Sequence, residues 1–259
     1  MAIHTKIKSS VLSLFVYLGI AVNLVGCANA LSSNGHRLDK TIPVEWTQHL
    51  SMASLLAEDV ATQTQKDLSL LLAKPWYSTI EVKGTKKEKS WVLGSCKDYF
   101  ALNQLGIRAQ KEQENNAFLA FKVMCEATRL LSQAKPAQHS NIPTIPLDET
   151  LPLKLPKSFS LATSQTELDR IQHNKNLTYW GDVNTIKKVE KKSPYQSTYY
   201  SDSGIHDLQI SGRGDINGDT WEDILIIIRD SIEGGHYFNL RLFVVTVKDQ
   251  NQWQVVAQY

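Results

Sequence analysis

Hydrophobic and polar positions follow a helical period in the first half of the chain and a strand period in the second half. Residues 112–133 carry apolar side chains three and four positions apart, which places Phe118, Phe121, Cys125 and Thr128 on one face. This spacing predicts one long amphipathic helix whose apolar face packs on a core.

Two shorter helical segments are expected before it. Residues 47–73 show helical spacing up to Pro75, which stops a helix. Residues 90–105 read as a short strand or turn followed by a helix. Ser95 is the expected N-cap of that helix, and Gly106 is its expected stop.

After residue 160 the period changes to that of strands. Short segments rich in β-branched and aromatic residues are separated by turn residues, which is typical of antiparallel hairpins. Ile224 to Ile228 is apolar at every position, so this strand is expected to be central and covered on both faces. The expected strands are Thr185–Val189, Ser197–Tyr200, Asp207–Ser211, Asp223–Arg229, Tyr237–Val247 and Trp253–Ala257. The predicted fold class is therefore α+β, with a mostly antiparallel sheet in the second half.

Prolines divide the chain. Five of its eight prolines lie between residues 136 and 156. Proline lacks a backbone donor and restricts the residue before it, so this stretch is neither helix nor central strand. It reads as an extended linker or as a strap lying across the surface. The expected organisation is a helical domain at 41–135, a Pro-rich linker at 136–160 and an antiparallel β domain at 161–259.

The first 26 residues have the order of a secretory signal peptide. Lys6 and Lys8 form a basic head, and Val11 to Val22 are almost free of polar residues. The alternative is a transmembrane anchor, but the apolar run is shorter than the roughly 20 residues that a spanning helix needs. We therefore expect export with removal of residues 1–26.

The end of this segment, Leu24-Val25-Gly26-Cys27, resembles the lipobox of bacterial lipoproteins. The resemblance implies that Cys27 is acylated and that the mature protein is held at a membrane by its lipid. Residues 27–40 then read as a flexible tether. Because Ala28 stands where a retention aspartate is found in other lipoproteins, the expected location is the outer membrane, facing the periplasm.

The net charge limits the kinds of partner that the protein can bind, and the cysteine content bears on its disulfide bonding. The chain has a formal net charge of +2, and the signal segment accounts for two lysines, so the rest is near neutral and nucleic acid is not an expected partner. Of three cysteines, Cys96 and Cys125 remain after lipidation of Cys27. In an oxidising compartment we expect them to form a disulfide, since Cys125 lies on the apolar helix face.

Acidic and amide residues alternate in one loop of the second half. Oxygen-bearing side chains occupy positions 1, 3, 5 and 9 of this loop, and Gly218 supplies the backbone freedom for a tight turn. Hard oxygen ligands in a flexible loop suit Ca²⁺ better than Zn²⁺ or Mg²⁺. The expected ligands are the side chains of Asp215, Asn217, Asp219 and Asp223 and the backbone carbonyl of Trp221.

This loop resembles the calcium loop of FG-GAP and VCBS-type repeats over roughly 20 residues. The resemblance implies a calcium ion with a structural role, and one copy does not imply a propeller. Two departures are Asn217 in place of an acid and Thr220 where glycine is common. An EF-hand is excluded because Ile226 stands where its glutamate is required. The alternative is a metal-free hairpin turn.

Catalytic motifs with known mechanics, such as a Gly-x-Ser-x-Gly elbow or a phosphate loop, do not occur in the sequence. His206 and His236 flank predicted strands near the loop but are expected to be ordinary edge residues. We therefore expect a non-enzymatic binding protein of the cell envelope with a protein partner. One alternative is a periplasmic immunity protein that neutralises a delivered toxin. Another is a peptidoglycan hydrolase that uses carboxylates such as Asp182, Glu190 or Asp207.

Overall fold

The computed structural model describes residues 41–47, 55–58, 60–85, 89–142, 144–248 and 252–259. All of them belong to one compact unit, residues 39–259. The expected signal peptide, the lipidated Cys27 and the tether lie outside the described residues. Within the described ranges, no helix combines the length and the apolar character that crossing a membrane requires.

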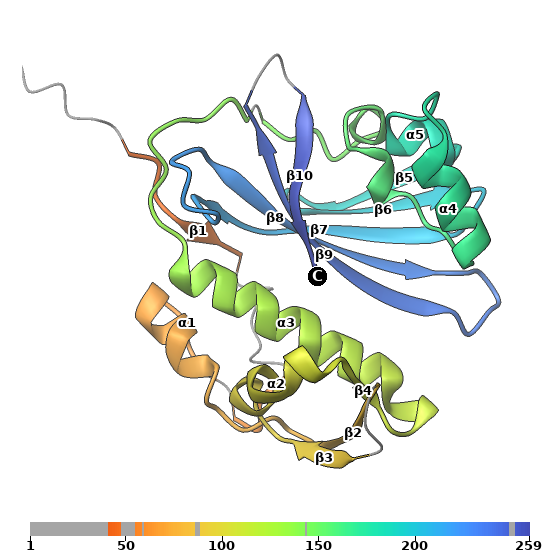
Figure 1. Cartoon of the computed structure of the whole chain (residues 1–259). Coiled ribbons are helices and arrows are strands. Elements are labelled where there is room, and N and C mark those ends of the chain that lie inside the picture. Colours follow the sequence, from red (N-terminus) through yellow and green to blue (C-terminus); the bar gives the residue numbers. More distant parts are fainter. Residues whose placement is uncertain (1–40, 48–54, 59, 86–88, 143, 249–251) are drawn as a thin grey trace, which may run out of the picture. The chain divides into compact units, whose positions relative to one another are not determined.

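The second half of the chain forms an antiparallel sheet, as its strand period predicts (Figure 1). Six strands lie in the order β10-β9-β8-β7-β6-β5, and the short β1 pairs with β7 beyond the end of β6. The strands are β1 (Glu45–Trp46), β5 (Ile186–Ser193), β6 (Gln196–Ser201), β7 (Ile205–Gly214), β8 (Asp223–Ser231), β9 (Phe238–Val247) and β10 (Trp253–Gln258).

The central strand β8 explains why residues 224–228 are apolar without interruption. Side chains of a strand alternate between the two faces of a sheet. Leu225 and Ile227 face one hydrophobic core, and Ile224, Ile226 and Ile228 face another. The expectation of a strand covered on both faces is therefore confirmed.

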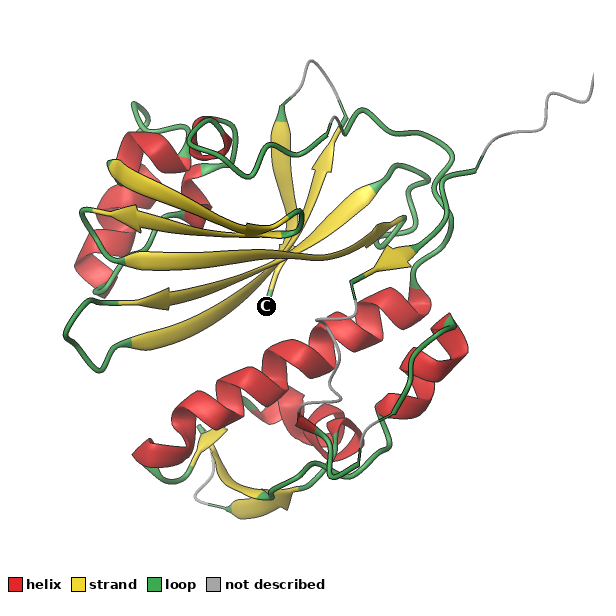
Figure 2. Cartoon of the chain, turned by 180° about the vertical axis from the view of Figure 1, so that it is seen from behind, coloured by secondary structure: helices red, strands yellow, loops and turns green. Residues whose placement is uncertain are grey.

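The long helix α3 (Asn115–Gln133) covers the first face. Its Phe121, Val123 and Leu131 share one core with Leu225 and Leu242 of the sheet. Figure 2 shows α3 lying between the large sheet and a second, smaller sheet. This core therefore contains residues from both sides of the expected domain boundary.

The proline stretch covers the second face of the sheet. Leu147, Leu151, Leu155 and Phe159 are all buried in the second core. They lie in or beside the 3₁₀ helices η5 (Leu151–Leu153) and η6 (Lys157–Phe159), and α4 (Gln165–His173) and α5 (Trp180–Val183) follow. A free linker does not describe these residues, because the apolar side chains between the prolines pack on the sheet.

The first half contains more strand than expected. Alternation in Ile80-Glu81-Val82-Lys83 places Ile80 and Val82 in the core, and the segment forms β2. The small antiparallel sheet has the order β3-β2-β4. Its strands are β2 (Ile80–Gly84), β3 (Ser90–Leu93) and β4 (Ile107–Ala109). The helical region expected at residues 41–135 therefore also contains a small antiparallel sheet.

The first helix is also shorter than its spacing indicates. α1 spans Gln65–Leu71, and residues 60–63 before it are not helical. Thr64 accepts a hydrogen bond from the Asp67 N–H, and the Asp67 carboxylate accepts one from the Thr64 N–H. This capping box fixes the start of the helix, which the apolar spacing alone does not locate.

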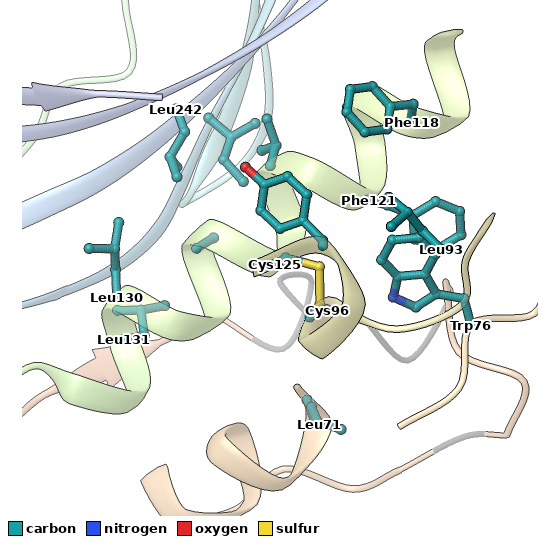
Figure 3. Close-up of a cluster of buried hydrophobic side chains, with 14 of the residues drawn as sticks. Leu71, Trp76, Leu93, Cys96, Phe118, Phe121, Cys125, Leu130, Leu131 and Leu242 are labelled. Carbon is teal, nitrogen blue, oxygen red and sulfur yellow. A yellow bond between two sulfur atoms is a disulfide. The ribbon is translucent and has the colours of Figure 1, made fainter. Parts of the chain in front are cut away.

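The expected disulfide joins α2 (Cys96–Leu102) to α3. The Cα atoms of Cys96 and Cys125 are 5.4 Å apart, and both residues are fully buried. Figure 3 shows the bridge inside the core that also holds Trp76 and Phe121, whose rings stack at 4.0 Å. A buried bridge of this kind has a structural role. The remaining short helices of this half are η3 (Asn103–Leu105) and η4 (Glu112–Glu114).

Candidate functional site

The candidate calcium loop is the turn between β7 and β8. Its acidic side chains fold it by accepting hydrogen bonds from its own backbone. The two carboxylate oxygens of Asp215 accept from the N–H groups of Gly218 at 2.7 Å and of Thr220 at 3.1 Å. Asn217 Oδ1 accepts from the Asp219 N–H at 2.9 Å. These contacts are those of Asx turns, so the Asp and Asn spacing dictates a tight loop.

Thr220 takes a backbone conformation that L-residues rarely adopt. Its φ is +73°, and among the described residues it is the one non-glycine residue with positive φ. A β-branched residue is disfavoured there. The strain is held by the Asp215 carboxylate on the Thr220 N–H and by the N–H groups of Gln138 and His139, which donate to the Thr220 carbonyl.

Asp223 closes the loop from the first position of β8. Its Oδ2 accepts from the N–H groups of Ile216 at 2.9 Å and Asn217 at 3.1 Å. Its Oδ1 is buried and has no hydrogen-bond partner among the described residues. Burial raises the pKa of this carboxyl to about 6, and the negative charges of Asp219 and Asp215 act in the same direction. A buried carboxylate oxygen without a hydrogen-bond partner is energetically costly.

Asp219 is held at the outer side of the loop. Its Oδ1 accepts from the Trp221 N–H at 2.9 Å, and its Oδ2 lies 2.5 Å from the Lys248 ammonium. Partial burial raises the pKa of Asp219, but Lys248 and the loop donors outweigh it and leave the pKa below its ordinary value. A cation binding here therefore has to compete with Lys248.

The expected ligands thus meet in one turn but do not form a finished cage. Asp215, Asn217, Asp219 and Asp223 all direct oxygens into the loop and its backbone. Across the described ranges, no group of three or more acidic, histidine or cysteine side chains has the arrangement of a metal site. The Trp221 ring lies 5.1 Å from the His139 ring. The donor chemistry fits a hard cation such as Ca²⁺, whereas the observed geometry is that of a self-capped turn.

Glu222 lies beside the loop, and the sequence predicts no role for it as a ligand or a structural contact. Its side chain is almost completely buried, and its Oε1 accepts from Arg213 Nε at 2.5 Å. The Ser140 hydroxyl donates to the other carboxylate oxygen. The Glu222 N–H donates to the His139 carbonyl at 2.8 Å. Glu222 therefore attaches the start of the proline stretch to the loop and orients Arg213.

A buried histidine forms a second polar cluster, which corrects the expectation of an edge residue. His206 is fully buried on β7 and lies opposite Asp230 of β8 in the strand register. Its Nδ1 is 2.7 Å from Asp230 Oδ1, and its Nε2 is 2.8 Å from Ser201 Oγ. The order serine, histidine and aspartate is that of a nucleophilic triad. The sequence alone does not reveal this arrangement, because His206 and Asp230 meet only through the pairing of β7 with β8.

Hydrogen bonding at Ser201 argues against a nucleophile. Its Oγ accepts from the N–H groups of Ser203 at 3.1 Å and Gly204 at 3.2 Å, so both of its lone pairs are engaged. Asp230 is also held by Arg241, whose remaining N–H groups donate to the carbonyls of residues 158–160. The cluster therefore connects the four strands β6, β7, β8 and β9 with one another and with the residues around η6.

The three carboxylates considered for hydrolysis have structural partners. Asp182 accepts from the N–H groups at the start of α5. Asp207 accepts from the Gln196 side chain. Glu190 is paired with two lysines, and their hydrogen bonds lower its pKa to about 2. Glu190 is therefore ionised near neutral pH and lacks the proton that a general acid has to donate.

Comparisons of the chain with models of protein families, with curated proteins and with solved structures found no match. The resemblance to FG-GAP and VCBS-type loops therefore rests on the residues of the β7–β8 turn.

Proposed function

We propose that this chain is an exported, lipid-anchored binding protein of the cell envelope without enzymatic activity, in which calcium stabilises the β7–β8 loop. The observation that carries the calcium part is the buried Asp223 Oδ1 without a hydrogen-bond partner. Asp215 and Asp219 lie in the same short loop, so three carboxylates occur within nine residues of the chain.

The charge balance of the loop supports a cation. One ammonium, from Lys248, pairs with Asp219. Burial and the neighbouring acids raise the pKa of Asp223, which means that the ionised carboxylate is unfavourable in the metal-free protein. A divalent cation cancels this repulsion and supplies the partner that Asp223 Oδ1 lacks. Calcium is the cation of choice because all of the available ligands are hard oxygens.

The hydrogen bonds and ion pairs that hold the candidate catalytic groups support a binding function over hydrolase activity. Ser201 Oγ accepts two backbone N–H bonds, which lower its nucleophilicity, and Glu190 is ionised near neutral pH and so has no proton to donate. The lipobox resemblance supports the anchor, and the near-neutral charge supports a partner other than nucleic acid. The partner is an envelope component that meets the protein at the membrane surface.

Thermal unfolding of the full chain purified in detergent tests the calcium part. We expect about 10 mM Ca²⁺ to raise Tm by roughly 3–10 °C relative to EDTA, given a Kd in the range of extracellular modules. The double variant Asp215→Ala with Asp219→Ala removes two loop carboxylates and loses this rise. The control Glu58→Ala with Asp169→Ala removes two exposed carboxylates outside the loop and keeps it. If the Tm of the wild type is the same in Ca²⁺ and in EDTA, the calcium proposal is wrong and the loop is a metal-free turn.

A further inference from the structure

A groove lies where β1 ends and β6 begins, along one edge of β7. The Thr47 N–H donates to the Ser211 carbonyl at 3.0 Å, and the Ile210 N–H donates to the Tyr195 carbonyl at 2.8 Å. Strands β1 and β6 thus follow one another along β7 without joining (β1 is labelled in Figure 1). The groove at this junction has a volume of about 810 Å³, which is in the range of small-ligand sites.

Aromatic and polar side chains line this groove together. Trp46 is partly buried against the core beneath α3, and Tyr195 is 51% exposed. The polar lining includes the carboxamide of Gln63, the carboxylate of Glu45 and the guanidinium-bearing Arg213. Aromatic rings offer apolar faces, while these polar groups include both donors and acceptors.

Arg213 has hydrogen-bonding capacity that its structural role leaves unused. Within the described part of the chain, its Nε binds Glu222 and its two terminal nitrogens have no partner. Arg241 differs, because all of its N–H groups are used by Asp230 and by backbone carbonyls. The buried Glu222 carboxylate fixes the Arg213 fork and neutralises its charge. Arg213 can therefore donate to a neutral ligand without a net attraction for anions.

We infer that this groove binds a neutral saccharide. A sugar ring has an apolar C–H face that packs on an aromatic ring, and its hydroxyls both donate and accept at the rim. Glu45 and Gln63 supply acceptors, and the terminal nitrogens of Arg213 supply donors. With Glu45 and Glu222 both present, an anionic ligand is disfavoured. The inference rests on the proposed binding function and gives its ligand class.

Calorimetric titration of the full chain in detergent tests this inference. The probes are chitotetraose and maltotetraose, with tetra-alanine as a peptide of similar length. We expect one of the saccharides to bind and tetra-alanine not to bind. Tyr195→Ala removes an exposed ring and is expected to weaken saccharide binding at least about tenfold, the equivalent of about 1.4 kcal/mol.

Two further variants separate the groove from general effects. Arg213→Lys keeps a positive charge for Glu222 but loses the terminal fork, so it also weakens saccharide binding. Tyr179→Ala removes another exposed tyrosine that does not line the groove, and it leaves binding unchanged. Absence of saccharide binding, equal loss in Tyr179→Ala, or binding of tetra-alanine instead would each overturn the inference.

Running the titrations in calcium and in EDTA keeps the two proposals apart. A calcium-dependent Tm with no saccharide binding overturns the groove and leaves the calcium loop standing. Saccharide binding that depends on Tyr195, with no effect of calcium on Tm, supports the groove and overturns the calcium loop.

Discussion

Replacing Asp223 by asparagine tests the electrostatics of the loop directly. Asparagine has nearly the same shape and keeps one oxygen to accept from the N–H groups of Ile216 and Asn217. It removes the charge whose pKa burial raises from 3.8 to about 6. The difference between these two pKa values corresponds to at most about 3 kcal/mol of stability lost by the wild type near pH 7.5 in EDTA.

Removing the charge relieves this loss of stability, but the substitution also introduces a cost. The new amide N–H₂ takes the place of the orphan Oδ1, and an unsatisfied buried donor costs about 1–3 kcal/mol. The Asp215 and Asp219 charges, which repel the Asp223 carboxylate, attract this N–H₂ group and lower that cost. We therefore expect Asp223→Asn to be more stable than the wild type in EDTA by about 1–2 kcal/mol, a Tm increase of roughly 2–8 °C.

Calcium and pH both change the comparison in predictable directions. In about 10 mM Ca²⁺ the wild type gains about 1–3 kcal/mol, and the variant gains little because a charged ligand is missing. Because the raised pKa belongs to an acid, the folded state binds more protons than the unfolded state between about pH 4 and pH 6. The stability of the metal-free wild type therefore falls as pH rises through this window.

Thermal unfolding followed by near-ultraviolet circular dichroism measures these effects, with Asp169→Asn as a control for loss of an exposed carboxylate. The advantage of Asp223→Asn in EDTA should shrink by about 2 kcal/mol between about pH 7.5 and pH 4.5. A variant less stable than the wild type in EDTA, with no dependence of the difference on pH, would refute the idea that the Asp223 charge lacks a partner.

Two other predictions concern the cysteines. The double variant Cys96→Ala with Cys125→Ala is expected to lose about 2–5 kcal/mol of unfolding free energy in urea titrations, since the bridge spans 29 positions of sequence; an unchanged midpoint would contradict this. Cys27→Ser is expected to abolish lipid labelling, and globomycin is expected to cause the uncut precursor to accumulate; normal processing in the presence of globomycin would rule out the lipobox.

The strand period of the sequence predicted most strands of the sheet, but it did not predict that the proline stretch packs on the second face of the sheet. The uninterrupted apolar run of β8 predicted a central strand, because each face of that strand packs on its own core. The proline stretch was read from its backbone restrictions alone. Its leucines, spaced four apart at 147, 151 and 155, are the signal that it packs on the sheet. Chain-breaking residues exclude regular structure but do not exclude burial.

The polar clusters depend on strand register, which a single sequence does not give. His206 meets Asp230 because β7 and β8 are antiparallel and these residues are direct partners. In the loop, by contrast, Asp215 and Asn217 bind N–H groups two to five residues further on. Contacts within a turn follow from the spacing of its residues, so the loop could be predicted and the histidine cluster could not.

Glu222 links the two proposed sites. It directly precedes Asp223 in the chain, and its carboxylate orients Arg213 at the groove. A cation that fixes the loop also fixes the position of Glu222, and thereby the direction of the Arg213 fork. Because linkage between two binding sites is reciprocal, we expect calcium to strengthen saccharide binding by the same factor by which the saccharide strengthens calcium binding. The factor is modest, since Ser140 and the His139 carbonyl already hold Glu222 in place without the metal.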